Sequence, residues 1–578
     1  MLPPFKAAAI QFEPTLFEKD ANIDALLQLV ESAAISGAKL ITTPEMATTG
    51  YCWYDRDEIT PYVEPVPGVT TERFAALARR YDCYIVIGMP EIETATKLYY
   101  NSAVLVGPDG IIGTHRKTHS YISEPKWAAA GDLGHRVFET AIGRIAMLIC
   151  MDIHFVETAR LVGLGGADVI CHISNWLAER TPAPYWINRA FENSCYLMES
   201  NRWGLERGVQ FSGGSCVIAP DASILAVVDN GNGIAEAVID PALARERKIW
   251  GEPIMEQRRP ELYTELMTNT FLWNPNDFFG LYSYQPRPAG DAVKVAVAEF
   301  IPEDNIAANL RTIELLTDEA KQKGARLVVF PERALTGLAQ SAMNACAIDG
   351  AEIAELKALS RNAGIGMIVG FAERDGEFCY NSAAFLDGGA LIGYYRQVHR
   401  TKADREWASA GSEWKVFDLP FGRVGLLVGH DASFPESGRI LALRGCDIIA
   451  CPSAVTQRFY SGHDGTSVCQ GDPIPTGADP LHWHQYRVRA GENNVYFLFA
   501  NICQMGGKGG FSGIFGPDTF AFPRNEAIIS GNARIAVAEI DTRNADPVYP
   551  TSVVRRKDLV SMRQTHHYSG LIVSQNNP

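Results

Sequence analysis

Residues 99–120 read YYNSAVLVGPDGIIGTHRKTHS, and residues 379–400 read CYNSAAFLDGGALIGYYRQVHR. In each stretch two apolar runs flank a turn signal of Gly, Pro or Asp, which is the pattern of a β-hairpin. The Asn-Ser pair at 101–102 aligns with the pair at 381–382. The match indicates that the chain contains the same structural unit twice.

The similarity extends outward from this hairpin in both directions. Before it, SGAKLITTPEMATTG (36–50) matches KGARLVVFPERALTG (323–337). After it, GRIAMLICMD (143–152) matches GRVGLLVGHD (422–431), and a later RAFEN has its counterpart in RAGEN. Because the order of the segments is the same in both copies, the chain is predicted to be a tandem repeat.

Each copy mixes strand-like and helix-like segments, which predicts an α/β layered domain. We predict domains at residues 1–272 and 292–578. Between them, residues 273–291 are rich in Pro, Gly and aromatic residues without a helical or alternating period, so they are predicted to be a linker.

Composition excludes several classes of protein. Of the 578 residues, 47% are hydrophobic and 21% are charged, as in a folded globular protein. The net charge is −15, and the charges are spread along the chain without a basic cluster that could bind nucleic acid. No run of about 20 apolar residues or secretory signal is evident, so we expect a cytoplasmic protein without a membrane partner. The 12 cysteines show no paired CxxC spacing, so no metal site is expected.

Three polar residues of the first copy follow strand-like segments in a characteristic order: Glu45 in TPEMATTGY, Lys117 in HRKTH and Cys150 in LICMD. Together with the SNW triplet at 174–176, they resemble the nitrilase, or carbon–nitrogen hydrolase, superfamily. The resemblance implies two tandem four-layer α-β-β-α sandwich domains. It also implies a Glu-Lys-Cys site that needs no metal or organic cofactor.

The resemblance assigns a role to each residue. Cys150 would be the nucleophile, and a nearby helix N-terminus and ammonium would favour its thiolate. Glu45 would act as general base and then general acid, and Lys117 would stabilise the oxyanion. Glu124, in SEPKWAAAGD, matches a second glutamate of amidase and carbamoylase branches and would orient the amide nitrogen or the attacking water.

Four more residues are candidates for lining the substrate pocket: Tyr51, His154, Asn175 and Trp176. Each has an ordinary structural interpretation, because Trp often fills a core and His is often a satisfied polar group. A lone buried cysteine is likewise more often an inert thiol than a nucleophile, so the assignment of Cys150 depends on the family context.

The second copy differs at the corresponding catalytic positions. In the order of Glu45, Lys117, Glu124 and Cys150 these are Glu332, Gln397, Asp404 and Gly429. Without a nucleophile, the second copy is predicted to be inactive. We expect it to serve the first copy as an internal pseudo-dimer partner that buttresses the first domain and helps to close its pocket, with further homo-oligomerisation left open.

The expected substrate is a small amide or N-carbamoyl compound. Nitrilases of the family typically have Cys-Trp-Glu at the nucleophile, whereas this chain has Cys150-Met151-Asp152. Hydrolysis of a nitrile is the first alternative, and acyl transfer to an amine is another. A non-catalytic binding or scaffold module of the same fold is the alternative from another class.

Overall fold

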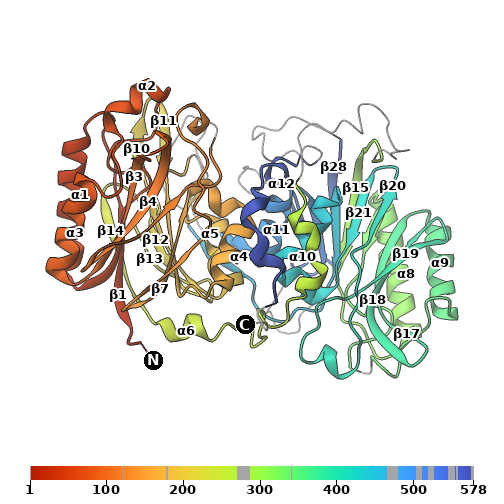
Figure 1. Ribbon diagram of the computed structural model, residues 1–578. Helices are drawn as coiled ribbons and strands as arrows, with labels where there is room; N and C mark the ends of the chain where they lie inside the picture. The colour runs from red at the N-terminus through yellow and green to blue at the C-terminus, as the bar shows by residue number, and fades with distance from the viewer. Residues whose placement is uncertain are drawn as a thin grey trace. The chain divides into compact units, whose positions relative to one another are not determined.

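The chain folds into two compact units in a computed structural model (Figure 1). Unit 1 comprises Met1–Ile249, Ser461–Trp483 and His566–Leu571, and unit 2 comprises Trp250–Tyr460, His484–Thr565 and Ile572–Pro578. The described residues are 2–121, 123–177, 180–269, 287–339, 341–464, 479–502, 511–517, 526–543, 554 and 557–574. Of the predicted linker 273–291, residues 273–286 lie outside this described part.

The first sheet of unit 1 has the strand order β14-β1-β2-β3-β4-β5. Strands β1, β2 and β3 are parallel, and the pairs β3-β4, β4-β5 and β1-β14 are antiparallel. The hairpin expected at residues 99–120 is the β4-β5 pair. The bounds are β1 (Phe5–Gln11), β2 (Ala38–Thr42), β3 (Tyr84–Ile92), β4 (Tyr99–Gly107), β5 (Gly110–Arg116) and β14 (Gly233–Ile239).

The second sheet of unit 1 has the order β13-β12-β9-β8-β7-β6, with β7, β8 and β9 parallel at its centre. All six residues of β8, VICHIS, are buried, as expected for a central parallel strand covered on both faces. The bounds are β6 (Val137–Thr140), β7 (Gly143–Ile149), β8 (Val169–Ser174), β9 (Tyr196–Asn201), β12 (Cys216–Ile218) and β13 (Ile224–Val227).

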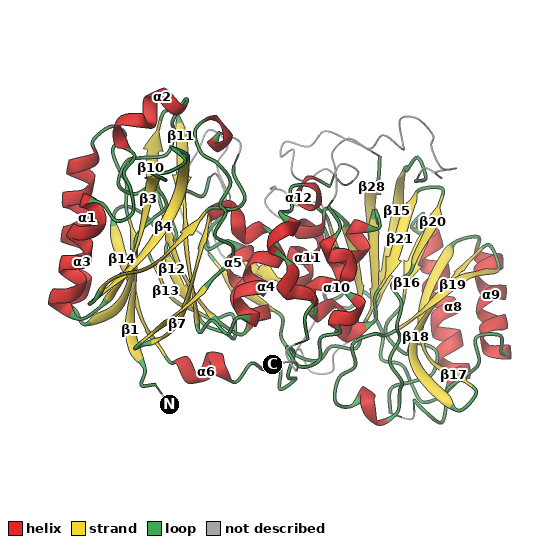
Figure 2. Cartoon of the chain, viewed as in Figure 1, coloured by secondary structure: helices red, strands yellow, loops and turns green. Residues whose placement is uncertain are grey.

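Helices cover the outer face of each sheet in unit 1 (Figure 2). Helices α1 (Lys19–Ile35) and α3 (Val69–Tyr81) pack on the first sheet, and α4 (Val156–Leu164) and α5 (Pro184–Asn193) pack on the second. The two sheets contact each other through β1 with β9 and β4 with β7. The predicted four-layer α-β-β-α sandwich is therefore confirmed.

Unit 2 repeats this architecture. Its sheets have the orders β19-β18-β17-β16-β15-β28 and β20-β21-β22-β25-β26-β27. The bounds of the first are β15 (Ala292–Ala298), β16 (Leu327–Val329), β17 (Gly366–Asp375), β18 (Phe378–Asp387), β19 (Ala390–Arg396) and β28 (Ile535–Asp541). Those of the second are β20 (Val416–Leu419), β21 (Gly422–Leu426), β22 (Ile448–Pro452), β25 (Tyr496–Ala500), β26 (Gly513–Phe515) and β27 (Ala527–Ile528).

The longer helices of unit 2 occupy the same places as those of unit 1. Helices α8 (Ile306–Gln322) and α9 (Ala351–Ala363) cover the first sheet, and α10 (Pro435–Leu443) and α11 (Gln485–Asn493) cover the second (Figure 2). Among the described residues there are also short 3-10 turns, the short helices α2 (Arg56–Ile59), α6 (Pro241–Arg245) and α12 (Asp558–Ser561), and the strand pairs β10 (Trp203–Glu206) with β11 (Val209–Ser212) and β23 (Tyr460–His463) with β24 (Asp479–His484).

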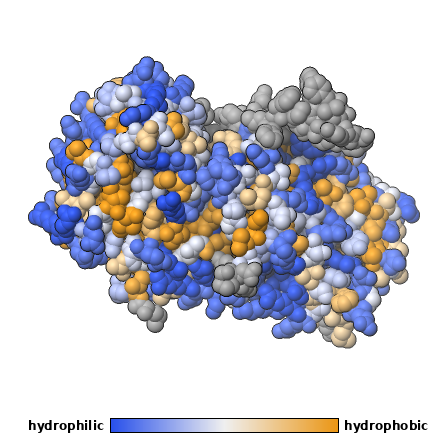
Figure 3. Space-filling view, in the orientation of Figure 1, coloured by the Kyte–Doolittle hydropathy of each residue, from blue (hydrophilic) through white to orange (hydrophobic). Residues whose placement is uncertain are grey.

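In each unit an apolar core lies between the helices and the sheet that they cover. One core joins α1 and α3 to the first sheet of unit 1, and the equivalent core of unit 2 joins α8 and α9 to its sheet. Figure 3 shows hydrophilic side chains interspersed with smaller apolar areas on the visible face of each unit. No helix among the described residues is long and apolar enough to span a bilayer.

Candidate active site

Glu45 lies in the loop that follows β2, and its side chain is fully buried. Its Oε1 accepts hydrogen bonds from Lys117 Nζ (2.8 Å) and Asn101 Nδ2 (2.7 Å). Its Oε2 accepts one from the backbone N–H of Asn175 at 2.8 Å. Residues that follow three different strands, β2, β5 and β8, thus converge on one carboxylate, because the carboxyl ends of these strands meet at one edge of the sandwich.

Lys117 bridges two carboxylates. Its Nζ lies 2.8 Å from Glu45 Oε1 and 2.8 Å from Glu124 Oε1, and all three side chains are at most 2% exposed. Asn101 donates to the same pair, with its Nδ2 2.7 Å from each of these oxygens. Two buried carboxylates would repel each other strongly, and the shared ammonium and amide offset that repulsion.

Cys150 follows β7 and begins a 3-10 turn, Cys150–His154, that precedes α4. Its φ of +44° places it in the left-handed region, a sparsely populated conformation for a residue with a side chain. Its carbonyl oxygen lies 3.1 Å from Nε2 of His172, whose Nδ1 in turn forms a short contact with Glu199. The buried His172–Glu199 pair therefore anchors the backbone of the strained residue.

The electrostatics of the cluster favour a resting thiol. Burial and the Glu45 carboxylate raise the pKa of Cys150 well above its usual range, and Lys117 opposes them only in part. Burial lowers the pKa of Lys117, but Cys150, Glu124 and Glu45 outweigh it and hold that pKa well above its ordinary value. A raised pKa of the Cys150 thiol means that a base is needed to take its proton when sulfur attacks.

Asp152 ties the cysteine turn to the Lys117 loop. Its buried carboxylate accepts from the backbone N–H of Ile149 (3.1 Å), Thr118 (3.2 Å) and His119 (3.0 Å). His115 and His119 also bond to it, and these bonds hold its pKa well below the usual range despite burial. Asp152 thus fixes the segments that carry Cys150 and Lys117 relative to each other.

The four residues predicted to line the pocket fall into two groups. Asn175 bonds to Glu45 through its backbone N–H and through its side chain, which donates to the Glu45 carbonyl at 3.0 Å, and Tyr51 lies with its ring centre 5.9 Å from Lys117 Nζ. His154 and Trp176 stack on each other at 4.7 Å, next to Tyr185. Burial, with Arg189 nearby, lowers the pKa of His154 to about 3, so its ring is neutral at physiological pH.

A segment from the end of the chain belongs to unit 1 and reaches this network. Tyr568 is fully buried, and its hydroxyl lies 3.0 Å from His119 Nε2, whose Nδ1 lies 3.1 Å from Asp152 Oδ1. Unit 2 contains the equivalent arrangement from the segment after Ile249: the Tyr263 hydroxyl lies 2.6 Å from His399 Nε2.

In unit 2 the corresponding cluster lacks both the nucleophile and the ammonium. Asn381 Nδ2 donates to Glu332 Oε1 at 2.9 Å, as Asn101 does to Glu45, but its second acceptor is Gln397 Oε1 at 3.2 Å. Gly429 has a φ of +46°, like Cys150, and a Cβ built there would lie 2.2 Å from Glu332 Oε2. The backbone conformation of the site is therefore retained without the cysteine and lysine side chains.

Several residues of the site had not been predicted as such from the sequence. Asn101 and Asp152 each have an identical counterpart in the second copy, Asn381 and Asp431, and this recurrence was a usable signal. Nothing local in the sequence pointed to Tyr568. No group of three or more His, Cys, Asp or Glu that could hold a metal occurs in the described part of the chain.

Comparison with known proteins finds one family model that matches both halves and relatives that each match less than half of the chain. The family model described as carbon-nitrogen hydrolase matches residues 6–249 and 294–545. A protein of Pyrococcus abyssi named nitrilase is 37% identical over 45% of this chain and 98% of its own length, and an omega-amidase of Xenopus tropicalis is 28% identical over 45% and 97%. A carbon-nitrogen hydrolase structure from Helicobacter pylori is 24% identical, with a TM-score of 0.43, over 46% of this chain and 99% of that one.

Proposed function

The chain belongs to the carbon–nitrogen hydrolase family and hydrolyses carbon–nitrogen bonds other than peptide bonds. We propose that its first repeat cleaves an amide or N-carbamoyl compound through a cysteine thioester. The observation that carries this proposal is the buried Glu45–Lys117–Glu124 cluster, whose three charges act on the buried Cys150 thiol. The second repeat has neither the cysteine nor the lysine.

In the first half of the reaction, Glu45 takes the proton of the Cys150 thiol as sulfur attacks the substrate carbonyl carbon. The carbonyl oxygen becomes negative, and the Lys117 ammonium stabilises it. Glu45 then gives its proton to the departing nitrogen, so that the carbon–nitrogen bond breaks and ammonia or an amine leaves a thioester behind.

In the second half, water attacks the thioester carbon and Glu45 takes one of its protons. The carbon–sulfur bond breaks, the carboxylic acid leaves, and the proton returns to sulfur. Glu124 orients the water or the amide nitrogen, a role that its shared contacts with Lys117 and Asn101 support. Tyr51 and Asn175, which contact the cluster, and the stacked pair His154 and Trp176 are proposed to contact the substrate.

Ammonia release from a panel of amides, N-carbamoyl compounds and nitriles tests this proposal. Wild type is expected to turn over at least one amide or N-carbamoyl compound, and Cys150→Ala is expected to turn over none. Stoichiometric labelling of Cys150 by an electrophile without any turnover would instead support a binding or scaffold protein. The nitriles are included because the Pyrococcus abyssi relative is named a nitrilase; turnover of nitriles alone would replace the amide proposal.

We also propose that the second repeat acts as a built-in structural partner of the first. Unit 1 includes residues 461–483 and 566–571, which come from after the start of the second repeat. Within unit 1, Arg180 Nη2 donates to the carbonyl of His463 at 3.1 Å and His482 Nε2 lies 2.5 Å from the carbonyl oxygen of Pro182.

Expression of residues 1–272 alone removes both of these segments from unit 1. We expect a protein that unfolds at lower denaturant concentration and hydrolyses substrate more slowly than the full chain. A monomeric, stable and fully active fragment would contradict the partner role while leaving the hydrolase proposal intact.

A further inference from the structure

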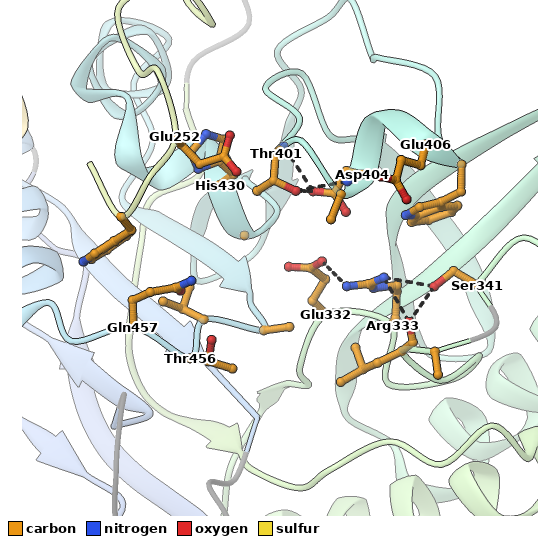
Figure 4. A pocket seen from close by; sticks show the side chains of 18 of the residues that line it. Glu252, Glu332, Arg333, Ser341, Thr401, Asp404, Glu406, His430, Thr456 and Gln457 are labelled. Atoms are coloured by element: carbon orange, nitrogen blue, oxygen red, sulfur yellow. Dashed lines mark hydrogen bonds and ion pairs between the residues drawn. The ribbon is translucent and has the colours of Figure 1, made fainter. Parts of the chain in front are cut away.

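Unit 2 contains a pocket of about 740 Å³ at the position that the catalytic cluster occupies in unit 1 (Figure 4). Glu332, Asp404 and Gly429, the counterparts of Glu45, Glu124 and Cys150, all line it. The volume is within the range of pockets that hold small organic ligands, about 300–1,000 Å³. The loss of catalytic residues has therefore not closed the site.

The pocket cannot form a thioester. Gly429 carries no side chain, and the space that a Cβ would take lies against Glu332 Oε2. A molecule that enters the pocket is therefore bound and released without attack by a thiol at this position.

The replacement of lysine by Gln397 leaves the two carboxylates without the cation that joins them in unit 1. The Gln397 side chain is used elsewhere: its Oε1 accepts from Asn381 and its Nε2 donates to the carbonyl of Val428 at 3.2 Å. Asp404 is 5% exposed, and its Oδ2 accepts from the Thr401 hydroxyl at 2.7 Å. Its other oxygen, Oδ1, has no hydrogen-bond partner among the described residues.

Figure 4 shows the Glu332 and Asp404 carboxyl groups lying toward the same part of the pocket. Burial raises the pKa of Glu332 against the opposing effect of Arg333, and the proximity of Asp404 raises it further. Two buried carboxylates at close range without a shared cation create a site that attracts positive charge.

The rest of the lining strengthens this preference. Glu252 and Glu406 add two carboxylates, whereas the one cation among the described lining residues, Arg333, is already engaged with Glu332 (3.2 Å) and the Ser341 hydroxyl (2.9 Å). Burial lowers the pKa of His430 to about 4, so its ring adds no charge at neutral pH. Trp250 and Trp407 also line the pocket and give it apolar walls. The Arg333 guanidinium already lies 5.5 Å from the centre of the Trp407 ring.

We propose that this pocket binds a small organic cation, a primary amine or guanidinium compound with an apolar or ring-bearing body. Its charged group takes the place between Glu332 and Asp404 that the Lys117 ammonium fills between Glu45 and Glu124, and its body packs on the tryptophan walls. This binding activity belongs to the second repeat and does not depend on which bond the first repeat cleaves.

Calorimetric titration of the full chain tests the proposal. The protein is first alkylated at Cys150 with iodoacetamide, so that the first site is blocked, and is then titrated with tyramine, agmatine and 3-(4-hydroxyphenyl)propionate. The last compound has the ring and chain of tyramine but carries a carboxylate in place of the ammonium. We expect one equivalent of tyramine or agmatine to bind and the propionate not to bind.

Asp404→Asn and Glu124→Gln form a matched pair of variants. Asp404→Asn is expected to weaken amine binding at least tenfold, whereas Glu124→Gln, its counterpart in the first repeat, is expected to leave amine affinity within twofold of the unsubstituted chain. If Asp404→Asn unfolds, Glu332→Gln replaces it, with the same expected loss. Failure of both amines to bind, equal binding of the propionate, or loss of binding in Glu124→Gln would each overturn the proposal.

Discussion

Replacement of Tyr568 by Phe removes one hydroxyl from the end of a hydrogen-bonded series that leads to the nucleophile. Tyr568 bonds to His119, His119 bonds to Asp152, and Asp152 accepts the N–H of Ile149, the residue before Cys150. Tyr263→Phe is the matched control, because its hydroxyl bonds to His399 and His399 Nδ1 lies 2.9 Å from Asp431, two residues after Gly429.

The size of the effect follows from the burial of this network. His119 and Tyr568 are at most 2% exposed, so the change leaves a buried ring nitrogen unpaired, which costs about 1–3 kcal/mol. Both variants are expected to lose about that much free energy of unfolding. We expect part of this cost to appear as a higher catalytic barrier, because the Cys150 turn is displaced. Since about 1.4 kcal/mol in a barrier is a tenfold change in rate, kcat of Tyr568→Phe should fall about three- to thirtyfold.

Ammonia release at saturating and at limiting substrate separates an effect on kcat from an effect on kcat/KM. Urea unfolding of the same variants measures their stability. The fall is expected mainly in kcat for Tyr568→Phe, with less than a twofold change for Tyr263→Phe. Equal rate effects in the two variants, or an unchanged kcat in Tyr568→Phe despite lost stability, would refute the idea that this tyrosine positions the nucleophile.

Three further predictions concern the catalytic lysine, the second site and His154. Lys117→Gln, which copies the second repeat, should lower kcat by about 10²–10³ in the ammonia assay, because the oxyanion loses its charged partner; retention of more than a tenth of the rate would contradict this role. Gly429→Cys combined with Gln397→Lys should restore no turnover in a Cys150→Ala chain, because the new Cβ would lie against Glu332; measurable ammonia release would show that the second site adapts. His154 is held neutral in the folded chain but takes up a proton below pH 6.5 when the chain is unfolded, so stability is lost as the pH falls from 6.5 toward 3. Between pH 7.5 and pH 5, urea unfolding should show wild type losing about 2 kcal/mol more free energy of unfolding than His154→Phe. Equal losses in the two proteins would contradict the neutral state of His154.

The architecture was predictable because it depends on local patterns that occur twice. Apolar runs such as residues 145–149 and 169–173 marked buried parallel strands, and both lie at the centre of a sheet. Once Glu45, Lys117 and Cys150 are placed after strands of a sandwich, their convergence follows, since the carboxyl ends of its parallel strands share an edge. The sandwich fold and family membership followed from the repeated motifs.

The partners of the buried polar groups depended on the tertiary structure. Asn101 bridges Glu45 and Glu124, and His172 reaches the Cys150 carbonyl, through contacts that no spacing in the chain encodes. The direction in which the pKa of Cys150 shifts follows from its burial and from Glu45, Lys117 and Glu124, and these neighbours come from distant parts of the chain.

The amino-acid order alone establishes two α/β copies, the strand ends that carry Glu45, Lys117 and Cys150, and the loss of the last two in the second copy. Only the folded chain decides that Tyr568 completes the network around His119, 449 residues away, and that a pocket persists beside Gly429. The reason is physical: periodicity and turn chemistry act over a few residues, whereas a buried hydrogen bond or cavity requires segments far apart in sequence to be packed together.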